Sequence, residues 1–178
     1  MSAADELLTR NERFAEADHE ELGFLPTLST LILTCADHRV DPAHTLGLEL
    51  GEAVMIRNGG GRVTPAAIQN MAMLAAVRHT DPNAPEQFEL ILMQHTDCGV
   101  GRLMADHTDA LAAYFGVAPE EVPAQSPDDP YRGIRVDMEK LASNPLIPAS
   151  LSVSGFVYEV KTGRAELVER RAPLRDDA

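Results

Sequence analysis

Short apolar runs alternate with amphipathic segments along the chain. Three runs of branched aliphatic residues, bounded by polar or turn-forming residues, predict buried strands. A fourth strand is predicted where apolar and polar residues alternate, and the turn after it leads into a short antiparallel edge strand. In chain order, the predicted strands lie at residues 27–34, 52–57, 88–93, 151–160 and 165–168.

Helical periodicity marks the segments before and between these strands. Residues 64–77 predict a helix with Thr64 as N-cap, Pro65 in the first helical position and an apolar stripe along one side. Residues 3–18 place apolar side chains at three- and four-residue spacing, which predicts an amphipathic helix that lies on another surface. Further helices are predicted at residues 99–115 and 134–142, and the proline-rich residues 118–132 are predicted to form a loop.

The order of these elements indicates the fold class. Strands that alternate with helices predict a parallel sheet, because each crossover helix returns the chain to the same end of the sheet. We therefore expect an α/β fold with a mostly parallel central sheet flanked by helices, plus the antiparallel edge strand. A length of 178 residues suits one domain, so residues 1–178 are predicted to form a single domain, with residues 1–20 as an N-terminal helical arm.

The charge balance narrows the class of partner. The chain has 28 acidic and 15 basic side chains, and its formal net charge is −13. A surface this negative repels phosphate backbones and anionic lipid headgroups, so we expect no nucleic-acid or membrane binding. The acidic N-terminus has no features of a secretory or transit peptide, and no apolar run approaches the ~18 residues of a membrane span. These observations predict a cytoplasmic protein.

Two cysteines occur in the chain, and each follows a predicted strand. Cys35 comes directly after the first strand, and Cys98 lies shortly after the third. Two thiols exclude a disulfide-rich scaffold and a four-cysteine zinc module. Because sites in parallel α/β sheets form outside the carboxyl ends of the strands, we expect both cysteines at the same edge of the sheet.

The residues around the two cysteines predict a zinc site. Cys35, Asp37 and Arg39 alternate along the chain, so they can share one side of an extended segment. His95 and Cys98 are three residues apart and can face one point in a turn. Zinc accepts two thiolates and one imidazole, and three protein ligands leave the fourth position for water, as in catalytic zinc sites. The alternatives are two buried core thiols or a redox pair, although the cysteines lack the Cys-x-x-Cys spacing of such pairs.

Asp37 has two possible states in such a site. As a fourth ligand it would close the zinc site, whereas an ion pair with Arg39 would leave the fourth position open. Asp37 is therefore either a gate or the acceptor that orients the bound hydroxide, and the spacing alone leaves both interpretations open.

Three motifs in order resemble the β-class carbonic anhydrases. They are Cys-x-Asp-x-Arg at residues 35–39, Arg-Asn-Gly-Gly-Gly at residues 57–61 and His-x-x-Cys-Gly at residues 95–99. The resemblance runs through about residues 30–102, and more loosely to the strand near residues 151–160. It implies one Zn²⁺ per chain, held by two cysteines and a histidine, and a catalytic dyad of an aspartate and an arginine. The implied zinc ligands are Cys35, His95 and Cys98, the implied dyad is Asp37 with Arg39, and the residues assigned to substrate binding are Gly59, Gly60 and Gly99.

The resemblance also implies an assembly. Family members form dimers or multiples of dimers, and their N-terminal helix embraces the neighbouring subunit, which fits the amphipathic residues 3–18. We therefore expect a homodimer or homotetramer. The chain departs from the family pattern at two positions, since His38 stands where serine or alanine is most frequent and Gly59 stands where alanine is usual.

The resemblance implies a small-molecule substrate, and the activity it implies is hydration of CO2 to bicarbonate by a zinc-bound hydroxide. The chain also resembles a compact branch of the family that contains carbonyl sulfide hydrolases, so the alternative is hydrolysis of carbonyl sulfide to H2S and CO2 at the same zinc site. A third possibility is a non-catalytic zinc protein in which Asp37 permanently closes the site.

Overall fold

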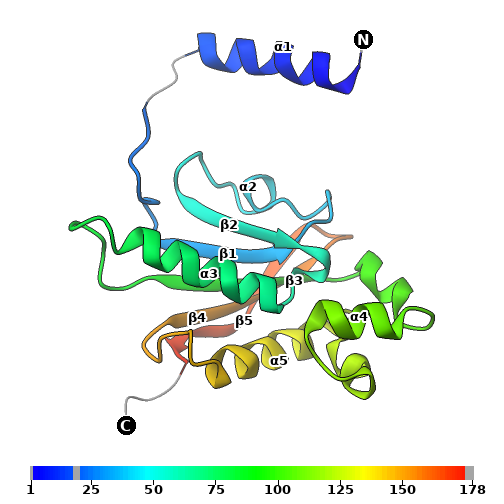
Figure 1. Cartoon of the computed structure of the whole chain (residues 1–178). Helices are drawn as coiled ribbons and strands as arrows, with labels where there is room; N and C mark the ends of the chain where they lie inside the picture. The colour runs from blue at the N-terminus through cyan, green and yellow to red at the C-terminus, as the bar shows by residue number, and fades with distance from the viewer. Residues whose placement is uncertain (1, 18–20, 175–178) are drawn as a thin grey trace.

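The computed structural model describes residues 2–17 and 21–174, and its centre is one five-stranded sheet (Figure 1). The strands are β1 (Thr30–Cys35), β2 (Ala53–Asn58), β3 (Glu89–His95), β4 (Ser152–Glu159) and β5 (Arg164–Pro173). Their order across the sheet is β2-β1-β3-β4-β5. The first four strands are parallel and β5 pairs antiparallel with β4, which confirms the predicted fold class. The edge strand β5 is longer than predicted.

Two helices of 14 residues pack on one face of the sheet, α3 (Pro65–Arg78) and α5 (Pro130–Ser143). Alternate residues of β1 and β3 point toward this face because side chains alternate along a strand. The core there contains Leu31, Leu33, Leu90 and Leu92 of the sheet with Met71 of α3 and Leu141 of α5. Thr64 caps α3 as predicted, since its hydroxyl oxygen accepts a hydrogen bond from the Ala67 N–H at 3.1 Å. No helix in the described ranges is long and apolar enough to span a membrane.

An aspartate followed by a proline begins two helices that the sequence analysis did not place there. Asp41 caps the short helix α2 (Pro42–Thr45), and Asp129 caps α5. Each carboxylate accepts a hydrogen bond from a backbone N–H of the first turn, while the proline occupies the first helical position, where no N–H is needed. As a result, α5 begins four residues before the predicted start and takes in the end of the predicted loop.

The prediction of one helix over residues 99–115 is wrong. The segment divides into a 3₁₀ turn, η2 (Gly99–Leu103), and a separate helix, α4 (Thr108–Phe115). Glycines at positions 99 and 101 weaken helix propagation, and His107, which precedes α4, has a non-helical backbone. The prediction of a loop over residues 118–132 is also wrong, because a second 3₁₀ segment, η3 (Pro119–Gln125), lies within it.

Helix α1 (Ala3–Glu16) stands apart from the rest of the chain (Figure 1), and none of its residues is buried. Ser2 and Asp5 form a capping box at its N-terminus. The apolar side chains of Leu7 and Leu8 are 61% and 64% exposed, so the described residues leave these two side chains of α1 largely uncovered. Residues 1 and 18–20 of the predicted arm lie outside the described residues.

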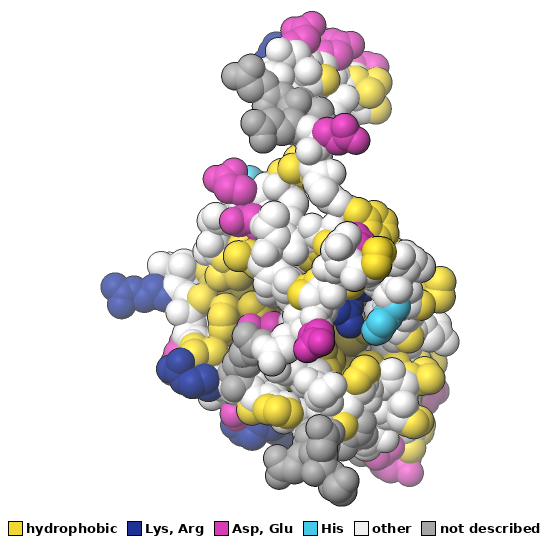
Figure 2. All heavy atoms as spheres, turned by 90° about the vertical axis from the view of Figure 1, so that its left-hand side faces the viewer, with side chains coloured by type: hydrophobic (Ala, Val, Ile, Leu, Met, Phe, Trp, Pro, Cys, Tyr) yellow, Lys and Arg dark blue, Asp and Glu magenta, His cyan; other side chains and the backbone are white. Residues whose placement is uncertain are grey.

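Hydrophobic side chains gather on the side of the molecule that Figure 2 shows, below α1. They include the walls of an apolar pocket of about 290 Å³ at the amino ends of the parallel strands, where Leu31, Val54 and Leu90 lie. Because the two cysteines lie at the carboxyl ends of the strands, this pocket is separate from the candidate site.

The ion pair between Arg62 and Asp137 is fully buried, and it anchors the segment that follows the glycine run. Arg62 Nε donates to Asp137 Oδ2 at 2.8 Å and Arg62 Nη2 donates to Asp137 Oδ1 at 3.1 Å. Both side chains have no solvent exposure. Arg62 also donates to the backbone oxygen of Gln125, and Gln94 Nε2 donates to Asp137 Oδ2 at 3.3 Å. This network joins β3, α5 and η3 behind the candidate site.

Candidate metal centre

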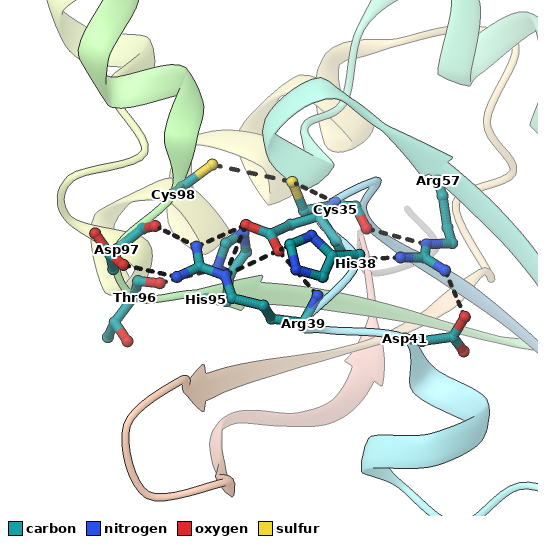
Figure 3. Close-up of polar contacts among 10 residues, drawn as sticks. Cys35, His38, Arg39, Asp41, Arg57, His95, Thr96, Asp97 and Cys98 are labelled. Carbon is teal, nitrogen blue, oxygen red and sulfur yellow. Dashed lines mark hydrogen bonds and ion pairs between the residues drawn. The ribbon is translucent and has the colours of Figure 1, made fainter.

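The ends of two neighbouring strands bring Cys35, His95 and Cys98 together. Cys35 is the last residue of β1, His95 is the last residue of β3, and the two strands are adjacent and parallel. One ligand atom of each of the three residues lies within 4.8 Å of the others, and all three residues are buried. The sulfur atoms of Cys35 and Cys98 are 3.9 Å apart (Figure 3). The same three residues are the ligands that the sequence predicts.

The hydrogen bonds of His95 indicate that this cluster suits a metal ion. Its Nδ1 lies 2.9 Å from the backbone oxygen of Thr96, an acceptor that fixes the proton on Nδ1. The lone pair of Nε2 is then free, and Nε2 is the one buried side-chain nitrogen or oxygen in the described ranges that has no hydrogen-bond partner. A buried polar atom without a partner is unfavourable, and a metal ion bound beside the two sulfurs would satisfy it.

The pKa values of the two thiols are shifted in opposite directions. A hydrogen bond from Cys98 lowers the pKa of Cys35 to about 4, against the opposing effect of burial. The pKa of Cys98 is raised by its hydrogen bond to Cys35 and by burial. Burial is the largest single effect on the pKa of His95 and lowers it, but the Cys35 thiolate, the Thr96 backbone oxygen and Asp37 together raise that pKa above its ordinary value. Cys35 is therefore the thiol that loses its proton first, and its thiolate attracts a cation.

The Asp37 carboxylate is paired with Arg39, while the Asp37 backbone N–H donates to the Cys35 sulfur at 3.4 Å. Arg39 Nε donates to Asp37 Oδ1 at 3.0 Å, Arg39 Nη2 donates to Asp37 Oδ2 at 2.7 Å, and the Arg39 backbone N–H donates to Oδ1 at 2.9 Å. These hydrogen bonds hold the pKa of Asp37 well below its usual range. Of the two states open to Asp37, the structure has the one in which it leaves the fourth metal position free.

Arg57 is a residue whose contribution the sequence analysis missed. Its guanidinium donates to the backbone oxygens of Cys35 at 3.1 Å and Asp37 at 2.8 Å, and to Asp41 Oδ2 at 2.6 Å (Figure 3). It thereby fixes the chain between the first cysteine and the aspartate. Arg57 is the first residue of the Arg-Asn-Gly-Gly-Gly motif at residues 57–61, so the sequence did point to it. Only the register of β1 and β2 shows that Arg57 pairs with Thr34, one residue before Cys35.

The glycine run packs tightly behind the cluster. Gly59, Gly60 and Gly61 form a 3₁₀ turn, η1 (Gly59–Gly61), directly after β2. Gly61 has a φ of 62°, and a Cβ there would lie 2.7 Å from the Cys35 backbone nitrogen, so only glycine fits. The hydroxyl of Tyr114 donates to the Gly59 oxygen at 3.0 Å. Gly99 is exposed at the start of η2, with open space where a Cβ would be, and the substrate-binding roles remain predictions.

His38 points away from the cluster. Its side chain is 92% exposed, and its Nδ1 lies 3.7 Å from Asp37 Oδ1. A side chain in that position faces solvent.

Comparison with known proteins identifies the family. A sequence profile of carbonic anhydrase matches residues 30–117, which contain all three cluster residues. β-Carbonic anhydrase 1 of Mycobacterium tuberculosis is 31% identical over 165 residues, covering 92% of this chain and 96% of that protein. The chain belongs to the β-carbonic anhydrase family.

One further relative and one solved structure extend the comparison. Carbon disulfide hydrolase of Acidianus sp. (strain A1-3) is 31% identical over 164 residues, covering 75% of this chain and 74% of that protein. The crystal structure of carbonic anhydrase from Streptococcus mutans superposes with a TM-score of 0.72 at 29% identity, covering 95% of this chain and 99% of that one. The resemblance to β-carbonic anhydrases is thus confirmed for sequence and fold, and the relatives support an enzyme of CO2 hydration or a related hydrolysis.

Proposed function

We propose that this protein is a zinc enzyme that hydrates CO2 to bicarbonate. The observation that carries the proposal is the buried Cys35, His95 and Cys98 cluster, with Asp37 held away from it by Arg39. When bound, one Zn²⁺ per chain supplies the Lewis acid that lowers the pKa of a water molecule and makes it a nucleophile near neutral pH.

In this proposal each residue of the chain has a defined task. Cys35, His95 and Cys98 hold the metal, and the Thr96 backbone oxygen fixes the tautomer of His95. Asp37 stays ionised at physiological pH because its pKa is lowered, so its carboxylate can accept a hydrogen bond from the nucleophile and orient the oxygen lone pair toward the substrate carbon. Arg39 keeps that carboxylate in place. The backbones of Gly59, Gly60 and Gly99 border the space that the substrate enters.

Hydrolysis of carbonyl sulfide is the second candidate function. It is favoured by the similarity to a carbon disulfide hydrolase, at 31% identity, since carbon disulfide and carbonyl sulfide are linear molecules like CO2 with an electrophilic central carbon. Attack on carbonyl sulfide would give H2S and CO2 with the same ligands and the same dyad. The third possibility, a site closed by Asp37, is opposed by the hydrogen bonds that bind Asp37 to Arg39.

One assay separates the two candidate functions. We expect rapid CO2 hydration and little release of H2S from carbonyl sulfide when both rates are measured on the same zinc-quantified protein. The hydration rate should rise from about pH 6 to about pH 9, because the nucleophile loses its proton over this range whereas Asp37 is ionised throughout it. Rapid H2S release with slow hydration would support the second function, and a flat pH profile would contradict the assigned nucleophile.

The remaining features of the proposal concern the whole chain. We infer that residues 1–178 form one zinc domain, with residues 1–20 as an arm, because all five strands of the described residues belong to one sheet. The exposed apolar side chains of α1 support a homodimer or homotetramer in which the arm covers a neighbouring copy. We also infer a cytoplasmic location, where a reducing environment keeps the ligand thiols available for metal.

A further inference from the structure

Arg39 binds two carboxylates, one from each of the loops that carry the metal-ligand residues. Its Nε and Nη2 donate to Asp37, and its Nη1 donates to Asp97 Oδ2 at 2.8 Å. Its Nη2 also donates to the Asp97 backbone oxygen at 2.9 Å (Figure 3). Asp97 lies between His95 and Cys98 in the sequence. The guanidinium therefore links the loop after β1 to the loop after β3.

The backbone at Asp97 is adapted to this contact. Asp97 has a φ of 56°, in the left-handed region, and Ser29 is the only other non-glycine residue of the described ranges with a positive φ. This conformation is unfavourable for most residues, although asparagine and aspartate tolerate it best. It lets the backbone oxygen and the carboxylate of one residue face the same guanidinium. Strain of this kind is maintained only where surrounding contacts hold it.

We propose that Asp97 is a positioning residue, which holds Arg39 across the mouth of the cluster so that Asp37 stays paired with Arg39 and away from the metal. The proposal rests on the function assigned above. A long arginine side chain that is 35% exposed has many rotamers, and a single partner restrains it weakly. With Asp97 as a second partner the guanidinium fork is fixed in the orientation that Asp37 needs.

A purely structural role explains Asp97 poorly. Its side chain is 58% exposed, and its bond to Arg39 crosses the surface of the molecule, not the core. The pair therefore contributes little to the stability of the fold. The bond constrains the position of Arg39. It thereby favours the state in which the Asp37 carboxylate pairs with Arg39 over the state in which it binds a metal ion.

The variant Asp97→Asn tests this role with little disturbance of the backbone. Asparagine tolerates the left-handed conformation as aspartate does, but its neutral amide accepts a weaker hydrogen bond from Arg39. Asp106→Asn is the matched control, because it makes the same charge change at an exposed residue of the segment that follows Cys98. A second background, Asp37→Asn, removes the carboxylate that would move to the metal.

The experiment loads each variant with Co²⁺ and records the visible absorption spectrum, which reports whether a carboxylate or water completes the coordination. We expect Asp97→Asn to increase the ratio of carboxylate-bound to open protein about two- to fivefold, the range that loss of an exposed ion pair gives. Asp106→Asn should leave the spectrum unchanged, and Asp97→Asn should have no effect in the Asp37→Asn background. The proposal would be overturned if Asp97→Asn gave the same spectrum as the parent protein. It would also be overturned if Asp97→Asn shifted the spectrum equally in the parent and in the Asp37→Asn background.

A measurement on the metal-free protein covers the case in which Asp97→Asn takes up no cobalt. The NMR signal of the Arg39 Nε–H is assigned by its absence from the spectrum of Arg39→Lys. We expect this proton to exchange with water about two- to fivefold faster in Asp97→Asn than in the parent protein. An unchanged exchange rate would overturn the positioning role. Failure of the proposed function looks different, because the parent protein itself would then bind no cobalt and hydrate no CO2.

Discussion

Replacing Cys98 with serine is expected to reduce zinc affinity more than about a hundredfold, because even loss of a group behind a metal ligand costs roughly ten- to a hundredfold. The serine hydroxyl is a poor zinc ligand near neutral pH, and only Cys35 and His95 would remain. We expect the purified variant to contain far less than one zinc per chain, and its rate of CO2 hydration to fall in proportion. Metal analysis and a hydration assay on one preparation measure both.

Thr96→Ser is the matched control for the cysteine variant. Thr96 is in the same loop, and a serine hydroxyl keeps the hydrogen bonds that Thr96 Oγ1 makes with Glu159 and with the Val160 N–H. This variant should retain zinc and activity. A Cys98→Ser protein that binds zinc as tightly as the parent would show that the metal, if present, lies elsewhere.

Replacing Arg62 with methionine is expected to lower the free energy of unfolding by about 3–5 kcal/mol, because Asp137 would keep a buried charge without its partner. Neither side chain of the pair has any exposed area, so water cannot take the place of the guanidinium. Methionine is unbranched and fills much of the same volume. Equilibrium unfolding in denaturant gives the change directly.

A second variant separates the loss of charge pairing from the loss of packing. In Arg62→Met with Asp137→Asn, a neutral amide replaces the buried carboxylate, and Gln94 can still hydrogen-bond to the side chain at position 137. We expect the double variant to recover about half of the lost stability or more, since an unpaired buried charge is the larger penalty. If the double variant were as unstable as Arg62→Met, packing and not charge would explain the effect.

The strand ends are the part of the site that the sequence predicts best. Cys35 and His95 each follow a short apolar run after one polar residue, and parallel strands meet at one edge, so the local pattern already indicates that the two lie together. The capping threonine of α3 was predictable for a similar reason, because its signal lies within four residues of chain. Where the physical cause is local, the sequence pattern is sufficient.

Contacts between distant segments were not predictable in this way. Arg39 and Asp97 are 58 residues apart, and Arg62 and Asp137 are 75 residues apart, so no periodicity relates them. Pairing of this kind depends on how α5 and the loops pack against the sheet. The error at residues 99–115 has another origin, since apolar spacing there is helical while glycines at 99 and 101 break the helix.

The choice of substrate is also hard to predict from the sequence, because it depends on contacts between distant segments. The proposed metal ligands and dyad lie in two short motifs, and a β-carbonic anhydrase and a carbon disulfide hydrolase are both 31% identical to this chain. The walls around the cluster, such as Tyr114 of α4 over Gly59, come from other parts of the chain. We expect selectivity between CO2 and carbonyl sulfide to depend on these walls.

The dependence of CO2 hydration on zinc content is the most direct test of the central claim. Zinc is removed with a chelator, restored in steps, and the hydration rate is measured at each measured occupancy of the parent protein. We expect the rate to fall to the uncatalysed level without zinc and to rise linearly until about one zinc is bound per chain. A rate that does not depend on zinc occupancy, or no hydration at full occupancy, would contradict a catalytic zinc held by Cys35, His95 and Cys98.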